Sequence, residues 1–265
     1  MQDLKITIVQ ADLAWEEKEK NLSHFSELLK DVSETDLIIL PEMFSTGFSM
    51  NNKPLAENMW GTSIEWMQNI SQEKNCVITG SLIIEDKNKY YNRLLWIQPD
   101  GEFEFYDKRH LFSLGEEHKH YSPGEMKIFP EIDSWKILPL ICYDLRFPIW
   151  ARQSSPFTEM GNHPYDVLIY VANWPEKRVY AWRQLLIARA IENQCYVVGV
   201  NRVGIDGNGF YHTGNSCVIN AMGEILFEVE KEECVQTISL SKQDLIATRR
   251  KLPFLDDRDE FEIKL

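Results

Sequence analysis

Residues Lys136 to Pro148 have the sequence K-I-L-P-L-I-C-Y-D-L-R-F-P. The apolar run from Ile137 to Ile141 predicts a buried β-strand, and Cys142 stands where that run stops. The polar residues and the proline that follow predict a sharp turn. A strand end followed by a turn presents one side chain beyond the sheet, with a backbone N–H beside it. A nucleophile that attacks a carbonyl needs this arrangement, because the N–H can donate to the oxyanion that forms. Because free cysteine is often a buried core residue, Cys142 alone favours a core role.

Composition limits the class of protein. The chain has 265 residues, which fit one large domain or two small ones, and its 44% hydrophobic content is ample for a core. The formal net charge is -13 without a cluster of Lys or Arg, which argues against nucleic acid and anionic membrane as partners. The N-terminus lacks a signal-peptide pattern, and no apolar run approaches bilayer length. The 5 cysteines have no close pairs and favour a reducing compartment, so we expect a cytoplasmic protein.

Strand and helix patterns alternate along the whole chain, which predicts an α/β fold. Helices are expected over 17–32, from Gly61-Thr62 onward, over 178–193 and over 241–251, and Met43 to Asn58 is expected to be a surface loop. Strands are expected at 4–10, 36–40, 76–84, 90–98, 102–106, on both sides of Ser134, and at 166–172, 195–203, 216–220, 224–230 and 235–240. No linker, repeat or low-complexity run divides the sequence. We therefore expect a single domain over residues 1–265, with an acidic tail from about residue 252.

Three apolar strands end on residues that can carry chemistry. The strands lead to Glu42, to Lys108 and to Cys142. If they are neighbours in one sheet, their ends can share a face, and ligands of α/β sheets bind beyond the carboxyl ends of strands. Each residue also has a structural alternative, which is a solvated loop carboxylate, a surface charge or core filler. Three capable residue types at three strand ends favour a shared site over three separate structural roles.

Three motifs resemble the signatures of the nitrilase superfamily of carbon–nitrogen hydrolases. They are L-P-E-M-F (Leu40 to Phe44), D-K-R-H-L-F (Asp107 to Phe112) and I-C-Y-D-L-R-F-P (Ile141 to Pro148). They occur in the family's order and at similar spacing, and the resemblance covers nearly the whole chain. It implies a four-layer α-β-β-α sandwich that pairs through helices into a homodimer. It also implies a catalytic Glu-Lys-Cys triad of Glu42, Lys108 and Cys142, with no cofactor.

The family has a second glutamate shortly before an S-P-G turn. That turn is Ser122-Pro123-Gly124 here, and counting back from it favours Glu117 over Glu116, which we expect to be a solvated neighbour. The resemblance implies that Glu117 orients the lysine and the substrate nitrogen.

The chemistry of this triad is consistent with its residue types. A thiol with a pKa of about 8.5 is mostly protonated at neutral pH and needs a base or a cation beside it. Glu42 can accept the thiol proton and return it to departing ammonia. Lys108 and the N–H of Tyr143 can stabilise the tetrahedral oxyanion.

The residues after the cysteine bear on the substrate. Nitrilases proper usually have Trp-Glu there, whereas Tyr143-Asp144 resembles the amidase branches. The wider sequence pattern resembles that of bacterial ω-amidases, which hydrolyse 2-oxoglutaramate and 2-oxosuccinamate to the 2-oxo diacid and ammonia. This pattern comprises Glu117-His118, Val171 to Pro175, Ala188 to Gln194 and Asn201 to Gly204. Alternatives are an N-carbamoyl-amine or aliphatic amidase of the same superfamily, and a catalytically silent binding protein on this fold.

Substrate contacts are expected from four residues. Arg146 can bind a substrate carboxylate with a bidentate fork, and its alternative is a salt bridge to Asp144 or another structural carboxylate. Phe44, Phe147 and Trp174 are candidate pocket walls, with ordinary packing as the alternative for at least one of them.

Other patterns give no further site. His118 and His120 lack a third ligand nearby, so we expect no metal. Asp206 to Gly209 hints at a calcium loop, but the later ligand positions fail and a turn is expected. The loop Arg152 to Tyr165 is longer than the family leads us to expect, and it is a candidate cover for the pocket or the dimer edge.

Overall fold

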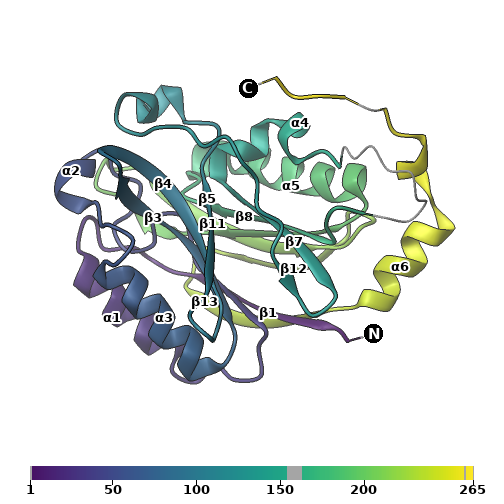
Figure 1. Ribbon diagram of the computed structural model, residues 1–265, viewed down its shortest axis with the longest axis horizontal. Helices are drawn as coiled ribbons and strands as arrows, with labels where there is room; N and C mark the ends of the chain where they lie inside the picture. The colour runs from purple at the N-terminus through teal and green to yellow at the C-terminus, as the bar shows by residue number, and fades with distance from the viewer. Residues whose placement is uncertain (1, 154–162, 260, 265) are drawn as a thin grey trace.

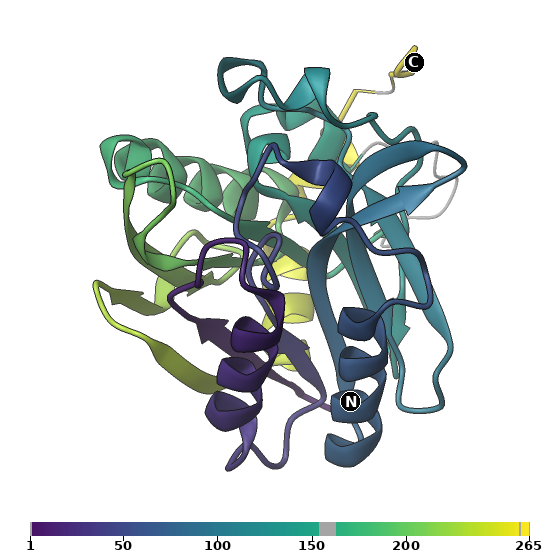
Figure 2. The ribbon, with the colours of Figure 1, turned by 90° about the vertical axis from the view of Figure 1, so that its left-hand side faces the viewer.

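The computed structural model describes residues 2–153, 163–259 and 261–264. Two β-sheets lie face to face, and helices cover the outer face of each (Figures 1 and 2). The layers therefore run helix, sheet, sheet, helix, which is the predicted α-β-β-α sandwich. The part of loop Arg152 to Tyr165 that spans 154–162 lies outside the described residues.

The first sheet has the strand order β13-β1-β2-β3-β4-β5. Its strands are β1 (Leu4–Gln10), β2 (Leu37–Ile39), β3 (Val77–Asp86), β4 (Lys89–Ile97), β5 (Phe103–Asp107) and β13 (Cys234–Leu240). Helices α1 (Lys18–Leu29) and α3 (Thr62–Lys74) cover its outer face (Figure 1). Phe25 of α1 and Met67 of α3 are fully buried against Ile38 of β2 in one apolar cluster. Because strand side chains alternate, Leu37 and Ile39 face the second sheet instead.

The second sheet has the order β10-β11-β9-β8-β7-β6, and β12 also pairs with β11. Its strands are β6 (Glu131–Ile132), β7 (Trp135–Ile141), β8 (Val167–Ala172), β9 (Tyr196–Asn201), β10 (Val203–Ile205), β11 (Tyr211–Ile219) and β12 (Ile225–Glu230). Strands β7, β8 and β9 are parallel and buried except for Lys136 of β7, which is half-buried. Helices α4 (Pro148–Ala151) and α5 (Val179–Asn193) lie on its outer side (Figure 1). A Cβ at Gly199 would come 2.6 Å from the Leu186 side chain and 2.7 Å from that of Trp182, so glycine permits this helix packing.

Met43 to Asn58 is not the predicted surface loop. Residues 43–47 are buried, and the short helix α2 (Asn52–Leu55) follows them. The polar groups of this segment have internal partners, since Met43 N–H donates to the Ser81 hydroxyl and Asn21 donates to the carbonyl of Ser45. Satisfied hydrogen bonds allow a polar segment to be buried, and this one forms part of the support beneath Glu42.

Helix α6 (Lys242–Lys251) is attached to the second sheet by a buried ionic cluster. The Asp166 carboxylate, just before β8, lies 2.6 Å from Lys242 Nζ and 2.6 Å from an Arg249 guanidinium nitrogen. Burial opposes ionisation of Asp166, but Arg249 and Lys242 outweigh it and lower the pKa of this carboxyl. The tail beyond α6 contains a short 3₁₀ helix, η5 (Phe254–Asp257), with Leu255 buried.

We expect Asp166→Ala to lower the free energy of unfolding by about 3 kcal/mol at neutral pH, because two buried cations lose their counter-ion. The pKa of Asp166 is lowered on folding, so its contribution is present above the unfolded pKa and is lost as pH falls through the folded value. The free energies of unfolding of the wild type and Asp166→Ala, measured with urea, should therefore converge in acid. Asp257→Ala, at an exposed carboxylate nearby, is the control and should unfold like the wild type.

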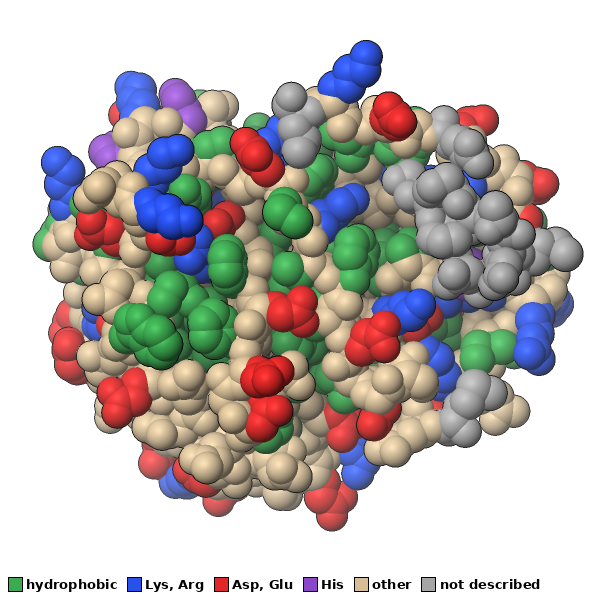
Figure 3. All heavy atoms as spheres, in the orientation of Figure 1, with side chains coloured by type: hydrophobic (Ala, Val, Ile, Leu, Met, Phe, Trp, Pro, Cys, Tyr) green, Lys and Arg blue, Asp and Glu red, His purple; other side chains and the backbone are tan. Residues whose placement is uncertain are grey.

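The face of the molecule in Figure 3 carries charged side chains of both signs. Acidic and basic side chains are interspersed over the described residues of the face in Figure 3, without a continuous basic stripe. Among the described helices, none combines the length and apolar character needed to cross a bilayer.

Candidate active site

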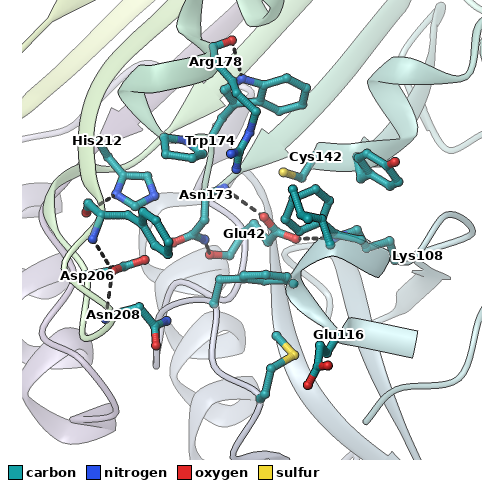
Figure 4. Close-up of a pocket in the computed structure, with 18 of the residues that line it drawn as sticks. Glu42, Lys108, Glu116, Cys142, Asn173, Trp174, Arg178, Asp206, Asn208 and His212 are labelled. Atoms are coloured by element: carbon teal, nitrogen blue, oxygen red, sulfur yellow. Dashed lines mark hydrogen bonds and ion pairs between the residues drawn. The ribbon is translucent and has the colours of Figure 1, made fainter. Parts of the chain in front are cut away.

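The candidate site lies where strand ends from both sheets meet. β2 and β5 are parallel to each other in the first sheet, so Glu42 and Lys108 follow strands that end at the same edge. Cys142 follows β7 and Asn173 follows its parallel neighbour β8 in the second sheet. The three strands are not neighbours in one sheet, as the sequence analysis had considered, because Cys142 faces the other two residues from the opposite sheet. Figure 4 shows Cys142, Glu42 and Lys108 pointing toward one another.

Cys142 occupies a strained turn. Its φ is 42°, in the left-handed region that non-glycine residues avoid, and it begins the 3₁₀ helix η3 (Cys142–Arg146) directly after β7. Such a conformation costs roughly 1–3 kcal/mol and persists only where the surroundings enforce it. Met43, which follows Glu42, has a φ of 44°. Cys142 and Met43 are thus two of the described non-glycine residues with positive φ, and both lie at the candidate site.

The Asp144 carboxylate holds this turn in place. It is fully buried and accepts hydrogen bonds from Ile141 N (3.1 Å), the Tyr106 hydroxyl (2.7 Å) and His110 N (3.0 Å). Tyr106 and His110 flank Lys108 in sequence. Asp144 thus fixes the cysteine turn relative to the segment that carries the lysine.

Lys108 lies between two buried carboxylates. Its Nζ is 2.8 Å from Glu42 Oε1 and 3.0 Å from both carboxylate oxygens of Glu117, and all three side chains are at most 1% exposed. Charge-assisted hydrogen bonds of this kind fix the geometry of both partners. Of the two sequence candidates, Glu117, in η2 (Glu117–Lys119), is therefore the one that reaches the lysine. Glu116 is exposed and pairs with Lys119.

One asparagine side chain and two backbone N–H groups complete the cluster. Asn92 Nδ2 of β4 donates to Glu42 Oε1 (2.8 Å) and to Glu117 Oε1 (3.3 Å). Asn173 N donates to Glu42 Oε2 (2.8 Å), and Phe112 N donates to Glu117 Oε2 (2.6 Å). The carboxylates are therefore held from several sides. Sequence analysis assigned no role to either asparagine.

Burial and charge set the protonation states. Burial first, and then the charge of Glu42, raise the pKa of the Cys142 thiol, while Lys108 opposes them. Burial disfavours the ammonium of Lys108, but Glu117 and Glu42 outweigh it and raise the pKa of this lysine. Burial also raises the pKa of Glu117 against the opposing effect of Lys108. The thiol is thus protonated at rest, beside a carboxylate able to take its proton.

A cavity of about 500 Å³ opens above this cluster. Its walls combine aromatic rings with polar groups, which is typical of a small-molecule site. Besides Glu42, Lys108 and Cys142, the lining includes Phe48, Phe112, Tyr143, Arg146, Asn173, Trp174, Arg178, Asp206, Asn208, Phe210 and His212. Of the four predicted substrate contacts, Arg146 and Trp174 line the cavity, and so does Tyr143, the predicted oxyanion donor.

Two predicted pocket walls lie elsewhere. Phe44 is fully buried in the core under α1 and α3, edge-on to Phe25 at 5.4 Å between ring centroids, because the chain turns inward after Glu42. Phe147 stacks on the His110 ring at 3.8 Å and packs behind the cysteine turn. Neither belongs to the cavity lining, so these two predictions are wrong.

Arg146 does not pair with Asp144. The Asp144 carboxylate is occupied by the partners named above, and the Arg146 guanidinium lies over the Trp174 ring at 4.9 Å. A second arginine, Arg178 at the end of η4 (Glu176–Arg178), also lines the cavity and was missed in the sequence. Its place at the start of a helix that follows a buried strand is the only sequence signal that could have suggested it.

The remaining patterns behave as turns. The Asp206 carboxylate accepts from the N–H groups of Asn208 and Phe210, both at 2.9 Å, which closes the predicted turn between β10 and β11. Within residues 2–153, 163–259 and 261–264, no group of three or more His, Cys, Asp or Glu side chains is placed to hold a metal ion.

Comparison with known proteins gives a consistent result. The sequence matches the carbon-nitrogen hydrolase family over residues 5–250. It is 43% identical over 264 residues to the omega-amidase YafV of Yersinia enterocolitica, covering 98% of this chain and 99% of that protein. It is 31% identical to a 2-oxoglutaramate amidase of Bacillus subtilis, over 95% of this chain and 96% of that protein. The fold superimposes on a CN-hydrolase superfamily protein from Xanthomonas campestris, solved with an arsenic adduct in its active site, with a TM-score of 0.97, 40% identity and 100% of both chains covered.

Proposed function

The chain belongs to the carbon–nitrogen hydrolase family, and we propose that it cleaves the terminal amide of 2-oxo acid amides such as 2-oxoglutaramate and 2-oxosuccinamate. The products are the 2-oxo diacid and ammonia. One observation carries this proposal above all. Cys142 lies beside the buried Glu42–Lys108–Glu117 cluster, at the base of a cavity whose wall carries the guanidinium groups of Arg146 and Arg178.

Acylation begins with Cys142. Its Sγ attacks the amide carbon while Glu42 accepts the thiol proton, so a protonated resting thiol is no obstacle. The oxyanion that forms is stabilised by Lys108 Nζ and by the N–H of Tyr143, in the first turn of η3, where helical N–H groups lack intrahelical acceptors. Glu42 then returns the proton to the nitrogen, and the carbon–nitrogen bond breaks. Ammonia departs, and the acyl group remains bound to Cys142 as a thioester.

Deacylation uses the same groups. Glu42 takes a proton from water, the hydroxide attacks the thioester carbon, and the carbon–sulfur bond breaks as the thiol is regenerated. Glu117 keeps Lys108 in place and faces the substrate nitrogen through the first half of the reaction. The overall balance is one amide and one water converted to one acid and one ammonia.

Other expectations accompany this proposal. We infer that the protein is a homodimer that pairs through helices, that its 265 residues form one domain, and that it works in the cytoplasm. The resemblance to the nitrilase superfamily supports the first of these, and the 5 cysteines without close pairs support the last.

Ammonia release from four substrates tests the proposal. We expect kcat/KM for 2-oxoglutaramate to exceed the values for glutamine, for an aliphatic nitrile and for N-carbamoyl-β-alanine by about 100-fold or more, because only the first offers both an amide and an anionic 2-oxo acid end. Faster release from N-carbamoyl-β-alanine would assign the protein to the carbamoyl-amine branch instead. A folded protein inactive on all four would contradict the proposed function.

A further inference from the structure

Two arginine side chains enter the same cavity from different elements. Arg146 lies in η3, four residues after the nucleophile, and Arg178 ends η4 beyond β8. Both are partly buried. Figure 4 shows Arg178 beside Trp174, on the side of the cavity that carries Cys142. The cavity above the nucleophile therefore carries two guanidinium groups in addition to the ammonium of Lys108.

No carboxylate in the described part of the chain forms an ion pair with either guanidinium. Arg146 lies over the Trp174 ring at 4.9 Å, and Arg178 lies over the Phe112 ring at 5.3 Å. The carboxylates that line the cavity have other partners. Glu42 binds Lys108, Glu116 binds Lys119, and Asp206 accepts from two backbone N–H groups.

The two guanidinium groups also act on each other. Burial first lowers the pKa of Arg178, Cys142 raises it, and the charge of Arg146 lowers it further. Two like charges that share a partly buried cavity without a counter-ion are unfavourable until an anion joins them. The cavity is therefore prepared for a ligand with a negatively charged group.

The backbone of Arg178 is fixed. Its N–H donates to the carbonyl of Pro175 (3.0 Å), and its own carbonyl accepts from Trp174 Nε1 (2.8 Å). These bonds attach the arginine to the segment that also carries Asn173, which donates to Glu42. The backbone of Arg178 is thus held at a set position relative to the base, and its guanidinium lies over the Phe112 ring.

We propose that Arg178 is a specificity-determining residue that holds the anionic end of the substrate together with Arg146. This inference rests on the proposed function and names the chemistry that selects its substrate. One guanidinium takes the carboxylate as a bidentate pair, and the other donates to the remaining carboxylate edge and to the 2-oxo oxygen.

The same arrangement excludes 2-amino acid amides. A guanidinium has only donors, and so has the ammonium group that replaces the 2-oxo oxygen in glutamine. Such a ligand would lose one hydrogen bond and gain a repulsive contact. Asp206, the lining carboxylate that could attract an ammonium, lies beside His212, across the cavity from Cys142 (Figure 4). The selection is therefore for 2-oxo acid amides over amino acid amides.

The test compares Arg178→Gln with the wild type on 2-oxoglutaramate and on pentanamide, a five-carbon amide without the acid and oxo groups. We expect KM for 2-oxoglutaramate to rise by about 10- to 100-fold with little change in kcat, because charged hydrogen bonds are lost far from the reacting carbon. Pentanamide turnover should stay at the wild-type rate. Arg178→Lys keeps the charge but loses the planar fork, so its KM for 2-oxoglutaramate should lie between those of the wild type and Arg178→Gln.

Lys177→Gln is the matched control, since it removes one positive charge at an exposed neighbour that does not line the cavity. It should leave kcat and KM for both substrates unchanged. An equal loss of kcat/KM for both substrates in Arg178→Gln would show a structural role and overturn the inference. An unchanged KM for 2-oxoglutaramate would overturn it as well. A wild type that prefers pentanamide would overturn the proposed function itself. A wild type that prefers 2-oxoglutaramate, with Arg178→Gln keeping that preference, would overturn only the role of Arg178.

Discussion

Cys142→Ala is expected to reduce ammonia release from 2-oxoglutaramate by about 10⁴-fold or more, because no thioester can form without its sulfur. The other cysteines cannot substitute for it, since Cys76, Cys195, Cys217 and Cys234 do not line the cavity. The fold should survive. Alanine tolerates the backbone conformation at this position no worse than cysteine, and loss of one buried sulfur costs about 1 kcal/mol.

Cys217→Ala is the matched control, because Cys217 is also a buried cysteine but lies in β11 and does not line the cavity. It should keep the wild-type rate. Acid quenching followed by mass spectrometry should detect an acyl adduct on the wild type and on Cys217→Ala, and none on Cys142→Ala. Circular dichroism checks that each variant is folded, and Cys142→Ser provides a second nucleophile variant should the alanine protein be unstable. A Cys142→Ala rate near that of the wild type would mean that the nucleophile has been misassigned.

The strand ends were predictable because each one interrupts an apolar run. Ile38 to Leu40 and Ile137 to Ile141 are long enough, and apolar enough, to identify buried strands without further information. A charged residue or a cysteine directly after such a strand therefore stands out in the sequence. What the sequence does not contain is the pairing of strands across space. Cys142 belongs to the sheet opposite that of Glu42 and Lys108, and no local sequence pattern indicates this.

The supporting residues were not predictable for the same reason. Asn92 lies inside β4 and looks like any polar residue of an alternating strand. It meets Glu42 and Glu117 only because β4 lies next to β5 in a particular register. Arg178 depends in the same way on where η4 lies relative to η3. Their positions depend on tertiary contacts, which local sequence patterns do not encode.

The buried segment after Glu42 shows a further limit. Residues 43–58 are polar and irregular in sequence, which predicts exposure. A polar side chain can be buried at little cost once it has a hydrogen-bond partner, as Ser81 provides for Met43 N and Asn21 for the carbonyl of Ser45. Polarity is visible in the sequence, but the partner is not. The error at Phe44 follows from the same cause, because an inward-turning segment carries its aromatic ring into the core.

Lys108→Met is expected to lower the free energy of unfolding by about 3–5 kcal/mol at neutral pH, because two buried carboxylates lose their shared cation. Glu42 and Glu117 are both fully buried, and each lies within 3.0 Å of the lysine nitrogen. Turnover should also fall by roughly 100- to 1000-fold, since one of the two oxyanion donors is removed.

The stability deficit should depend on pH in a definite direction. Burial already raises the pKa of Glu117 while Lys108 opposes it, so the pKa should rise further in the variant. A carboxyl group whose folded pKa lies above its unfolded pKa weakens the fold as pH rises through the folded value, and does no harm below the unfolded value. Urea unfolding should therefore show a large deficit near about pH 8 that shrinks toward about pH 5.

Lys127→Met is the control for this experiment. Lys127 is partly buried, donates to the Trp150 carbonyl at 3.0 Å, and has its pKa lowered by burial. Among the residues that the structure describes, no carboxylate forms an ion pair with it. Removing its charge leaves no buried anion behind, so its stability should change by less than about 1 kcal/mol, without recovery in acid. If Lys108→Met shows the same small deficit at every pH, then Glu42 and Glu117 do not depend on the lysine for their burial, and the proposed role of this cluster in positioning the base fails with it.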